Sequence, residues 1–314
     1  MTPLLPAPLA LVCHDFGATR LILPWLGPDA RGVRAHLQGP AIALWRQHFG
    51  DRALLPSVDL ALEGARWLLS GTSLTAELEH RARIEATLRG MRTVAVIDHW
   101  VHYAARFQRD GVRLLPDEIW VCDAEAYALA QARFPGHPLR LQPNTWLRAQ
   151  VERMAPCPDP RLQTTVLVLI EPLGQRWGGA IPGEEQALAF LLSQAHRLGL
   201  KPPLSLRLRP HASDPPDRWE AWIQAHQDRV EATVDRSPTW SEAMDDVAWV
   251  AGFESTALVV ALATGRRAVC IQPPWVPRAR LPQRGLIHLR DLLPADPPLV
   301  WRPGSDADAR SSGG

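Results

Sequence analysis

The sequence predicts an α/β protein built from two doubly wound, Rossmann-like domains with parallel sheets. Short apolar runs rich in β-branched residues alternate with stretches of helical length and spacing. This alternation starts near Leu9 and starts again near Thr165, and the proline-rich run MAPCPDPR lies between the two series. Strands that alternate with helices form parallel sheets, and 314 residues are enough for two such cores.

The domain boundaries follow from the same pattern. We expect an N-terminal domain over residues 1–150, a linker over 151–163 and a second domain over 164–303. Residues 304–314 are too polar to fold alone, so a disordered tail is expected there. Two such domains facing each other would place their strand ends on a central cleft.

In the N-terminal domain, the runs with strand character are 9–13, 32–37, 67–69, 93–97, 119–122 and 139–141. Helices are expected after residue 16, over 41–49 and 75–88, and up to residue 132. In the second domain the strands are expected at 165–170, 204–208, 230–234, 247–250 and 266–271. The helices there are expected at 184–198, 219–226, 240–244 and between 255 and 265.

Composition excludes several classes of function. Hydrophobic residues make up 46% of the chain and charged residues 21%, with a net charge of +1. So small a charge does not favour nucleic acid as a partner. No apolar run approaches the roughly 18 residues of a membrane span, and the start lacks the basic segment of a signal peptide. A cytoplasmic protein is expected, with peripheral membrane association left open.

The stretch VAWVAGFESTALVVALATG, residues 247–265, predicts a strand, a tight turn and a helix. Gly252 allows the sharp turn, Ser255 or Thr256 can cap the helix, and Gly265 is placed to end it. Backbone N–H groups at such a helix start attract an anion or a sugar hydroxyl. With Glu254, this turn is either a donor-phosphate site or an ordinary helix cap.

Arg209 and His211 follow the strand 204–208, and both suit a phosphate group. The sequence places them at a strand end adjacent to the 254–256 turn. A solvated loop histidine is the alternative interpretation of His211.

Polar residues also follow strands in the N-terminal domain. Asp15, before Gly17, is either a general base for a sugar hydroxyl or the N-cap of the next helix. Thr72 and Ser73 either bind hydroxyl groups or cap a helix. All three follow predicted strands.

The segment DHWVHY directly follows the strand 93–97. It offers Asp98 and His99 to the cleft, with Trp100 or Tyr103 able to stack on a sugar or base. Arg106 is placed to pair with Asp98, which would make both residues structural. The His99–His102 spacing also occurs in metal sites, but no third ligand is evident, so no metal is predicted.

The two-domain layout, the RPH strand end and the segment GFESTALVVALATGRRAV resemble the donor-binding half of GT-B-type enzymes. That group includes nucleotide-sugar glycosyltransferases and UDP-N-acetylglucosamine 2-epimerases. Its bacterial sialyltransferases and polysialyltransferases carry an acidic-acidic-Gly motif, a His-Pro motif and a Ser/Thr pair. The resemblance implies that Asp15 is the acceptor base, that His211 holds the donor phosphate, and that Ser255 and Thr256 complete that site.

The first hypothesis is therefore a bacterial, metal-independent GT-B glycosyltransferase without a cofactor. It would transfer a sugar from a nucleotide-sugar donor to a surface glycan or protein, using Asp15 and His211. The second is a sugar-nucleotide epimerase or hydrolase that uses Asp98, His99 and His211. The third is a non-catalytic sugar-nucleotide-binding protein of the same fold.

Overall fold

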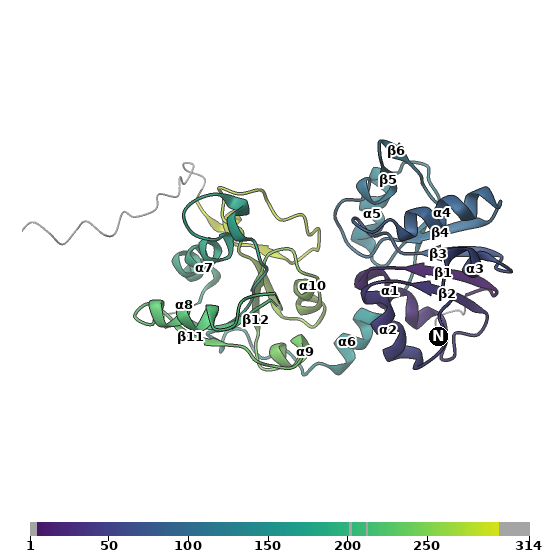
Figure 1. Cartoon of the computed structure of the whole chain (residues 1–314). Coiled ribbons are helices and arrows are strands. Elements are labelled where there is room, and N and C mark those ends of the chain that lie inside the picture. The colour runs from purple at the N-terminus through teal and green to yellow at the C-terminus, as the bar shows by residue number, and fades with distance from the viewer. Residues whose placement is uncertain (1–4, 201–202, 212, 295–314) are drawn as a thin grey trace, which may run out of the picture. The chain divides into compact units, whose positions relative to one another are not determined.

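The computed structural model describes residues 5–200, 203–211 and 213–294 (Figure 1). By its internal contacts the chain divides into an N-terminal unit, Met1–Ala149, and a C-terminal unit, Gln150–Gly314. Each unit contains one six-stranded sheet in which every neighbouring pair of strands is parallel. Two Rossmann-like parallel-sheet domains, as expected from the sequence, are therefore confirmed.

The sheet of the N-terminal unit has the order β2-β1-β3-β4-β7-β8. Its strands are β1 (Leu9–Cys13), β2 (Val33–Leu37), β3 (Trp67–Ser70), β4 (Arg92–Val96), β7 (Glu118–Val121) and β8 (Leu139–Leu141). The helices are α1 (Phe16–Ile22), α2 (Pro40–Phe49), α3 (Val58–Leu62), α4 (Leu78–Leu88) and α5 (Ala124–Arg133). The helix α6 (Thr145–Arg153) begins in this unit and ends in the C-terminal unit. A separate hairpin joins β5 (Gln108–Arg109) to β6 (Val112–Arg113).

The sheet of the C-terminal unit has the order β11-β10-β9-β12-β13-β14. Its strands are β9 (Thr165–Leu169), β10 (Ser205–Arg209), β11 (Glu231–Val234), β12 (Trp249–Gly252), β13 (Arg267–Cys270) and β14 (Ile287–His288). The helices are α7 (Gly183–Gln194), α8 (Arg218–His226), α9 (Trp240–Met244) and α10 (Thr256–Ala263). Short 3₁₀ helices lie at Leu23–Trp25, Ala105–Phe107, Gly174–Trp177, Ala195–Leu198 and Leu289–Leu292.

Central strands of both sheets are buried on both faces. All five residues of β1 and four of the five in β9 are buried, because helices cover the two sides of each sheet. This explains why the sequence shows continuous apolar runs rather than alternating ones.

Each sheet has one point at which the strand order reverses. In the N-terminal unit it lies between β1 and β3, and in the C-terminal unit between β9 and β12. Loops from the carboxyl ends of such neighbouring strands lead away in opposite directions and leave a crevice between them, where doubly wound sheets bind their ligands. The residues that follow β1, β3, β9 and β12 are therefore the first to consider.

Several local predictions were wrong. The helix α3, the β5–β6 hairpin and the strand β14 were not expected, and α4 begins at Leu78 rather than residue 75. Residues 151–163, expected as a linker, include the end of α6 and belong by their contacts to the C-terminal unit, where Trp249 Nε1 donates to the carbonyl of Pro160 (3.1 Å). The expected tail 304–314 lies outside the described residues.

Candidate functional site

A histidine and an aspartate stand directly after β1, at the crevice of the N-terminal unit. His14 Nδ1 lies 2.7 Å from Asp15 Oδ1, and both side chains remain partly exposed, at 30% and 38%. Asp15 occupies the N-cap position of α1, but its side chain makes no capping hydrogen bond. Its carboxylate instead orients the imidazole, which leaves Nε2 as the nitrogen that could take a proton.

A buried carboxyl group fixes the backbone at this point. Glu79, on α4, is 1% exposed, and its Oε1 accepts the backbone N–H of His14 at 2.8 Å. Burial raises the pKa of Glu79, while the His14 N–H and nearby Arg83 act in the opposite direction. The chain turn that carries His14 is thus tied to α4 across the crevice.

A polar cavity of about 480 Å³ adjoins His14. Its wall includes His36, which lies in β2, Gln38, which directly follows β2, and carboxylates on α3 and α4. His36 Nδ1 donates to the carbonyl of Leu55 (2.8 Å), so its other ring nitrogen can accept from Gln38 Nε2 (3.3 Å). Such a wall offers many hydrogen-bonding groups to a hydroxyl-rich molecule beside the His14–Asp15 pair.

Asp98 is engaged within the N-terminal unit. Its Oδ1 accepts from Arg106 Nη1 at 2.8 Å, and the same nitrogen donates to the Thr72 carbonyl at 2.8 Å. Arg106 is 5% exposed and Thr72 is 1% exposed. The sequence-based alternative, in which Arg106 pairs with Asp98, is therefore the arrangement observed.

Gly17 is the residue that makes room for Asp98. A Cβ atom at position 17 would lie 1.7 Å from Asp98 Oδ2. We expect Gly17→Ala to destabilise the N-terminal unit by about 1–3 kcal/mol, as overpacking of a closed site does. Urea unfolding would measure this loss. In an Asp98→Ala background the same glycine change should cost far less, and an equal cost in both backgrounds would contradict the steric explanation.

The other residues predicted near the acceptor have local partners. Ser73 Oγ accepts the backbone N–H of Ala76 (2.9 Å) in the segment before α4, whose N-cap is Glu77 rather than Ser73. Tyr103 is 6% exposed and its hydroxyl donates to the Ala126 carbonyl (3.2 Å). His99 packs edge-on against Trp100, with ring centroids 5.2 Å apart. Contacts of Thr72, Ser73, Asp98, His99 and Tyr103 with an acceptor remain predictions.

In the C-terminal unit, α10 begins as expected. Ser255 is the N-cap, and its side chain accepts the N–H of Ala257 (3.2 Å). Gly265 has φ +79°, the left-handed geometry that glycine adopts most readily after a helix. Thr256 is the first helical residue. The strand, turn and helix of residues 247–265 are therefore confirmed, but binding of a ligand at Gly252, Ser255 and Thr256 remains a prediction.

A carboxylate of the protein already lies at the start of α10. Glu171 follows β9, and its Oε1 accepts the N–H of Glu254 at 3.0 Å. Burial raises the pKa of Glu171 to about 7, although the N–H groups of residues 253–255 favour its charged form. Sequence reasoning missed Glu171, which occupies the position expected for a donor phosphate.

Both carboxylate oxygens of Glu254 accept hydrogen bonds from Arg280. Its Oε2 accepts from Arg280 Nη2 (2.8 Å), and its Oε1 accepts the backbone N–H of Arg280 (2.6 Å). Glu254 thus anchors the 273–282 loop against the start of α10. Its predicted role as a donor ligand remains a prediction.

Arg209 and His211 lie after β10. Arg209 Nη1 pairs with the buried carboxylate of Asp235 and donates to the Ser237 carbonyl (3.1 Å). His211 is exposed, and its Nδ1 accepts the backbone N–H of Ser213 (3.2 Å). The neutral ring therefore carries its proton on Nε2, which is the nitrogen that could donate to a phosphate.

The expectation that these two residues share adjacent strand ends with the 254–256 turn was wrong. In the sheet, β9 lies between β10 and β12. This order arises because the chain returns past its first strand, so the end of β9, with Glu171, separates the two clusters. Spatial neighbours of that kind cannot be read from the sequence order of the strands.

The described ranges contain neither a metal-ligating cluster nor a membrane-spanning helix. No cluster there combines three or more His, Cys, Asp and Glu side chains suited to a metal ion. No helix of the described part combines the length and apolar character needed to cross a bilayer.

Comparison with known proteins gives distant structural similarity only. No protein-family model and no curated protein sequence matches the chain. Os79 from O. sativa, in complex with U2F and trichothecene, aligns at 11% identity over 90% of this chain and 89% of that chain, with a TM-score of 0.41. Arabidopsis thaliana UGT89C1, complexed with UDP-L-rhamnose, aligns at 10% identity over 85% of this chain and 79% of that chain, with a TM-score of 0.41. Similarity at this level assigns no role to individual residues.

Proposed function

We propose that the chain is a metal-independent glycosyltransferase that moves a sugar from a nucleotide-sugar donor to a hydroxyl group of an acceptor. The observation that carries this proposal is the His14–Asp15 pair at the crevice of the N-terminal unit. A base held by a carboxylate at 2.7 Å, partly exposed and beside a polar cavity, suits deprotonation of a hydroxyl. His14 is the base in this reaction, and Asp15, which the sequence analysis took as the base, orients the imidazole of His14.

In the proposed reaction, His14 Nε2 takes the acceptor proton while the acceptor oxygen attacks the anomeric carbon of the donor. The bond from that carbon to the phosphate oxygen breaks, and the nucleotide leaves with the electron pair. Asp15 stabilises the imidazolium that forms. Displacement in one step inverts the anomeric configuration.

The leaving phosphate is proposed to bind in the C-terminal unit. The first turn of α10, capped by Ser255, supplies donors to it. The polar wall around His14 supports a hydroxyl-rich acceptor, which we propose is a bacterial surface glycan or protein.

One observation favours a second candidate, a protein of the same fold that binds sugar nucleotides weakly and does not transfer the sugar. Glu171 lies at the start of α10 and accepts the Glu254 N–H there. In its charged form this carboxylate competes with a phosphate for the same backbone groups. If the donor phosphate binds weakly for this reason, the protein keeps its fold but does not transfer the sugar efficiently.

Donor binding and turnover distinguish these functions. In a thermal-shift screen with CMP, UDP, GDP and dTDP sugars, one donor at 100 times its Kd is expected to stabilise the protein by about 2.7 kcal/mol. Product analysis of that donor, with and without a glycan acceptor, follows. Transfer only with acceptor supports the first function, consumption without acceptor indicates an epimerase or hydrolase, and binding without turnover indicates the second candidate.

A further inference from the structure

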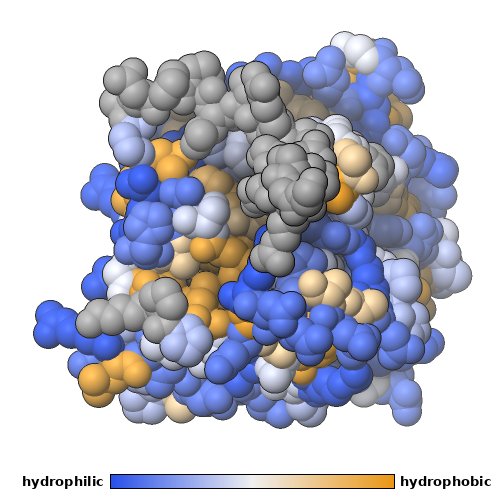
Figure 2. Space-filling view, turned by 90° about the vertical axis from the view of Figure 1, so that its left-hand side faces the viewer, coloured by the Kyte–Doolittle hydropathy of each residue, from blue (hydrophilic) through white to orange (hydrophobic). Residues whose placement is uncertain are grey.

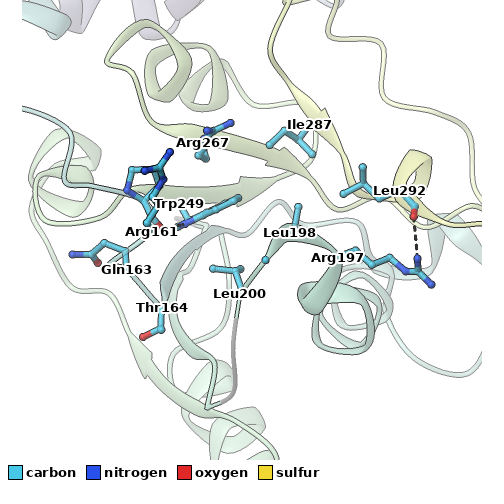
Figure 3. A pocket seen from close by; sticks show the side chains of 12 residues that line it. Arg161, Gln163, Thr164, Arg197, Leu198, Leu200, Trp249, Arg267, Ile287 and Leu292 are labelled. Atoms are coloured by element: carbon cyan, nitrogen blue, oxygen red, sulfur yellow. Dashed lines mark hydrogen bonds between the residues drawn. The ribbon is translucent and has the colours of Figure 1, made fainter.

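A cavity of about 560 Å³ lies at the amino-terminal edge of the C-terminal sheet (Figure 3). Trp249, Arg267 and Ile287 are the first residues of β12, β13 and β14, and all three line it. Thr164, just before β9, lines it as well. A volume between roughly 300 and 1,000 Å³ is typical of small-molecule sites.

This edge is opposite the proposed donor site. Glu171 and the start of α10 follow the carboxyl ends of β9 and β12, whereas the cavity adjoins the amino ends of the same strands. A five-residue strand such as β9 spans about 16 Å. A ligand in this cavity therefore would not share contacts with a donor phosphate at α10.

The cavity wall is held in place by hydrogen bonds. Trp249 Nε1 donates to the Pro160 carbonyl at 3.1 Å, which fixes the segment that carries Arg161. Arg197 Nη1 donates to the Leu292 carbonyl at 3.1 Å, drawn as a dashed line in Figure 3. Trp249 and Arg267 are register partners on neighbouring strands, so their side chains are adjacent. The site is therefore built from five separate segments of one unit.

The charged side chains that line the cavity are all positive among the described residues. Arg161, Arg197 and Arg267 line the cavity, and no Asp or Glu is among the described residues that line it. Arg161 and Arg267 are exposed, and neither guanidinium has a hydrogen-bond or ion-pair partner within the described part of the chain. By contrast, Arg207 and Arg218 of the same unit pair with carboxylates. The cavity thus carries positive charge that the described residues do not neutralise.

The remaining wall is largely apolar, with the side chains of Leu198, Leu200, Trp249, Ile287 and Leu292. On the face of the molecule drawn in Figure 2, apolar residues gather in a hollow bordered by hydrophilic ones. We propose that the cavity at the amino edge of the C-terminal sheet binds an amphipathic anion, with its carboxylate or phosphate at Arg161 and Arg267 and its apolar body against Trp249 and the leucines. The anion can be a free acid or the head and upper chain of a lipid.

Titration of the full-length chain with decanoate tests the site. Binding measured by calorimetry is expected to saturate at one decanoate per chain, and decan-1-ol should bind at least about 10-fold more weakly because it lacks the charge. The double variant Arg161→Gln/Arg267→Gln is expected to lose about 10-fold in decanoate affinity, or about 1.4 kcal/mol. Arg153→Gln/Arg229→Gln, which removes two exposed charges of the same unit outside the cavity, should leave the affinity unchanged.

A second arm separates the two sources of the anion. Co-sedimentation with vesicles of phosphatidylglycerol that depends on Arg161 and Arg267 assigns the site to a lipid, and binding of decanoate without vesicle binding assigns it to a free acid. Three results would overturn the proposal: no saturable decanoate binding, equal affinity for decanoate and decan-1-ol, or equal losses in the two double variants. A Trp249→Phe variant that retains the fold provides an independent check, since it should also weaken decanoate binding.

Discussion

Replacement of His14 by alanine is expected to lower the rate of sugar transfer by about 10²- to 10⁴-fold, the usual contribution of a general base. Donor affinity should stay within about two-fold, because His14 lies in the N-terminal unit and the proposed phosphate contacts lie in the other. Single-turnover kinetics with the donor found in the binding screen measures the rate. Thermal shift with the same donor measures affinity.

Two further variants separate the possible bases. Asp15→Asn should also reduce transfer strongly, because an amide cannot stabilise the imidazolium that forms when His14 takes a proton. His48→Ala, which removes an exposed histidine of the same unit, should have no effect. If the His14→Ala variant keeps most of its activity while Asp15→Asn loses it, Asp15 acts alone and the assignment of His14 is wrong.

The fold was predictable because it depends on patterns that are local in the chain. Runs such as Leu9–Cys13 are apolar at every position, since both faces of the sheet are covered. The helix start at Ser255 and its end at Gly265 follow from capping chemistry that involves only near neighbours. Short elements such as α3 have too few residues for a periodic pattern to identify them.

The site was less predictable because the order of the strands in the sheet, which differs from their order along the chain, brings its residues together. Glu171 and the 254–256 turn are 83 residues apart at their hydrogen bond, and nothing near Glu171 in the sequence indicates a partner. Glu79 reaches His14 from α4 in the same way. His14 itself could have been recognised, because it stands between a strand and the aspartate that was singled out. The sequence-based hypothesis made the neighbouring Asp15 the base, whereas we propose that His14 takes the proton and Asp15 orients it.

Replacement of Glu171 by glutamine is expected to make the C-terminal unit more stable at pH 8, by roughly 3 kcal/mol. The pKa of Glu171 is raised from its ordinary value of 4.5 to about 7 by burial, so the folded protein prefers the neutral acid. The native state then holds more protons than the unfolded chain between these two pH values, and its stability falls as pH rises through them. The neutral amide avoids this loss. The advantage of the variant should therefore vanish below about pH 4.5.

Unfolding at a series of pH values measures the difference in the free energy of unfolding between the wild type and the Glu171→Gln variant. Contributions of other titrating groups, such as Glu79, cancel in this difference. Glu231→Gln, which neutralises an exposed carboxylate of the same unit, should show no such pH-dependent gain. A constant difference at all pH values would show that Glu171 stays ionised in the folded protein.

The same substitution tests the relation of Glu171 to the donor site. A phosphate and the Glu171 carboxylate would share the N–H groups at the start of α10, and two negative charges at such a distance repel each other strongly in a partly buried site. Glu171→Gln should therefore raise nucleoside-diphosphate affinity about 10-fold at pH 8 and by less at pH 6, where the wild-type carboxyl group is mostly protonated. Unchanged affinity at both pH values, in a variant that shows the expected stability gain, would mean that the donor phosphate binds elsewhere than α10. Loss of affinity would instead make Glu171 a ligand of the donor sugar or ribose hydroxyl groups, because only an accepting carboxylate at this position would then favour binding.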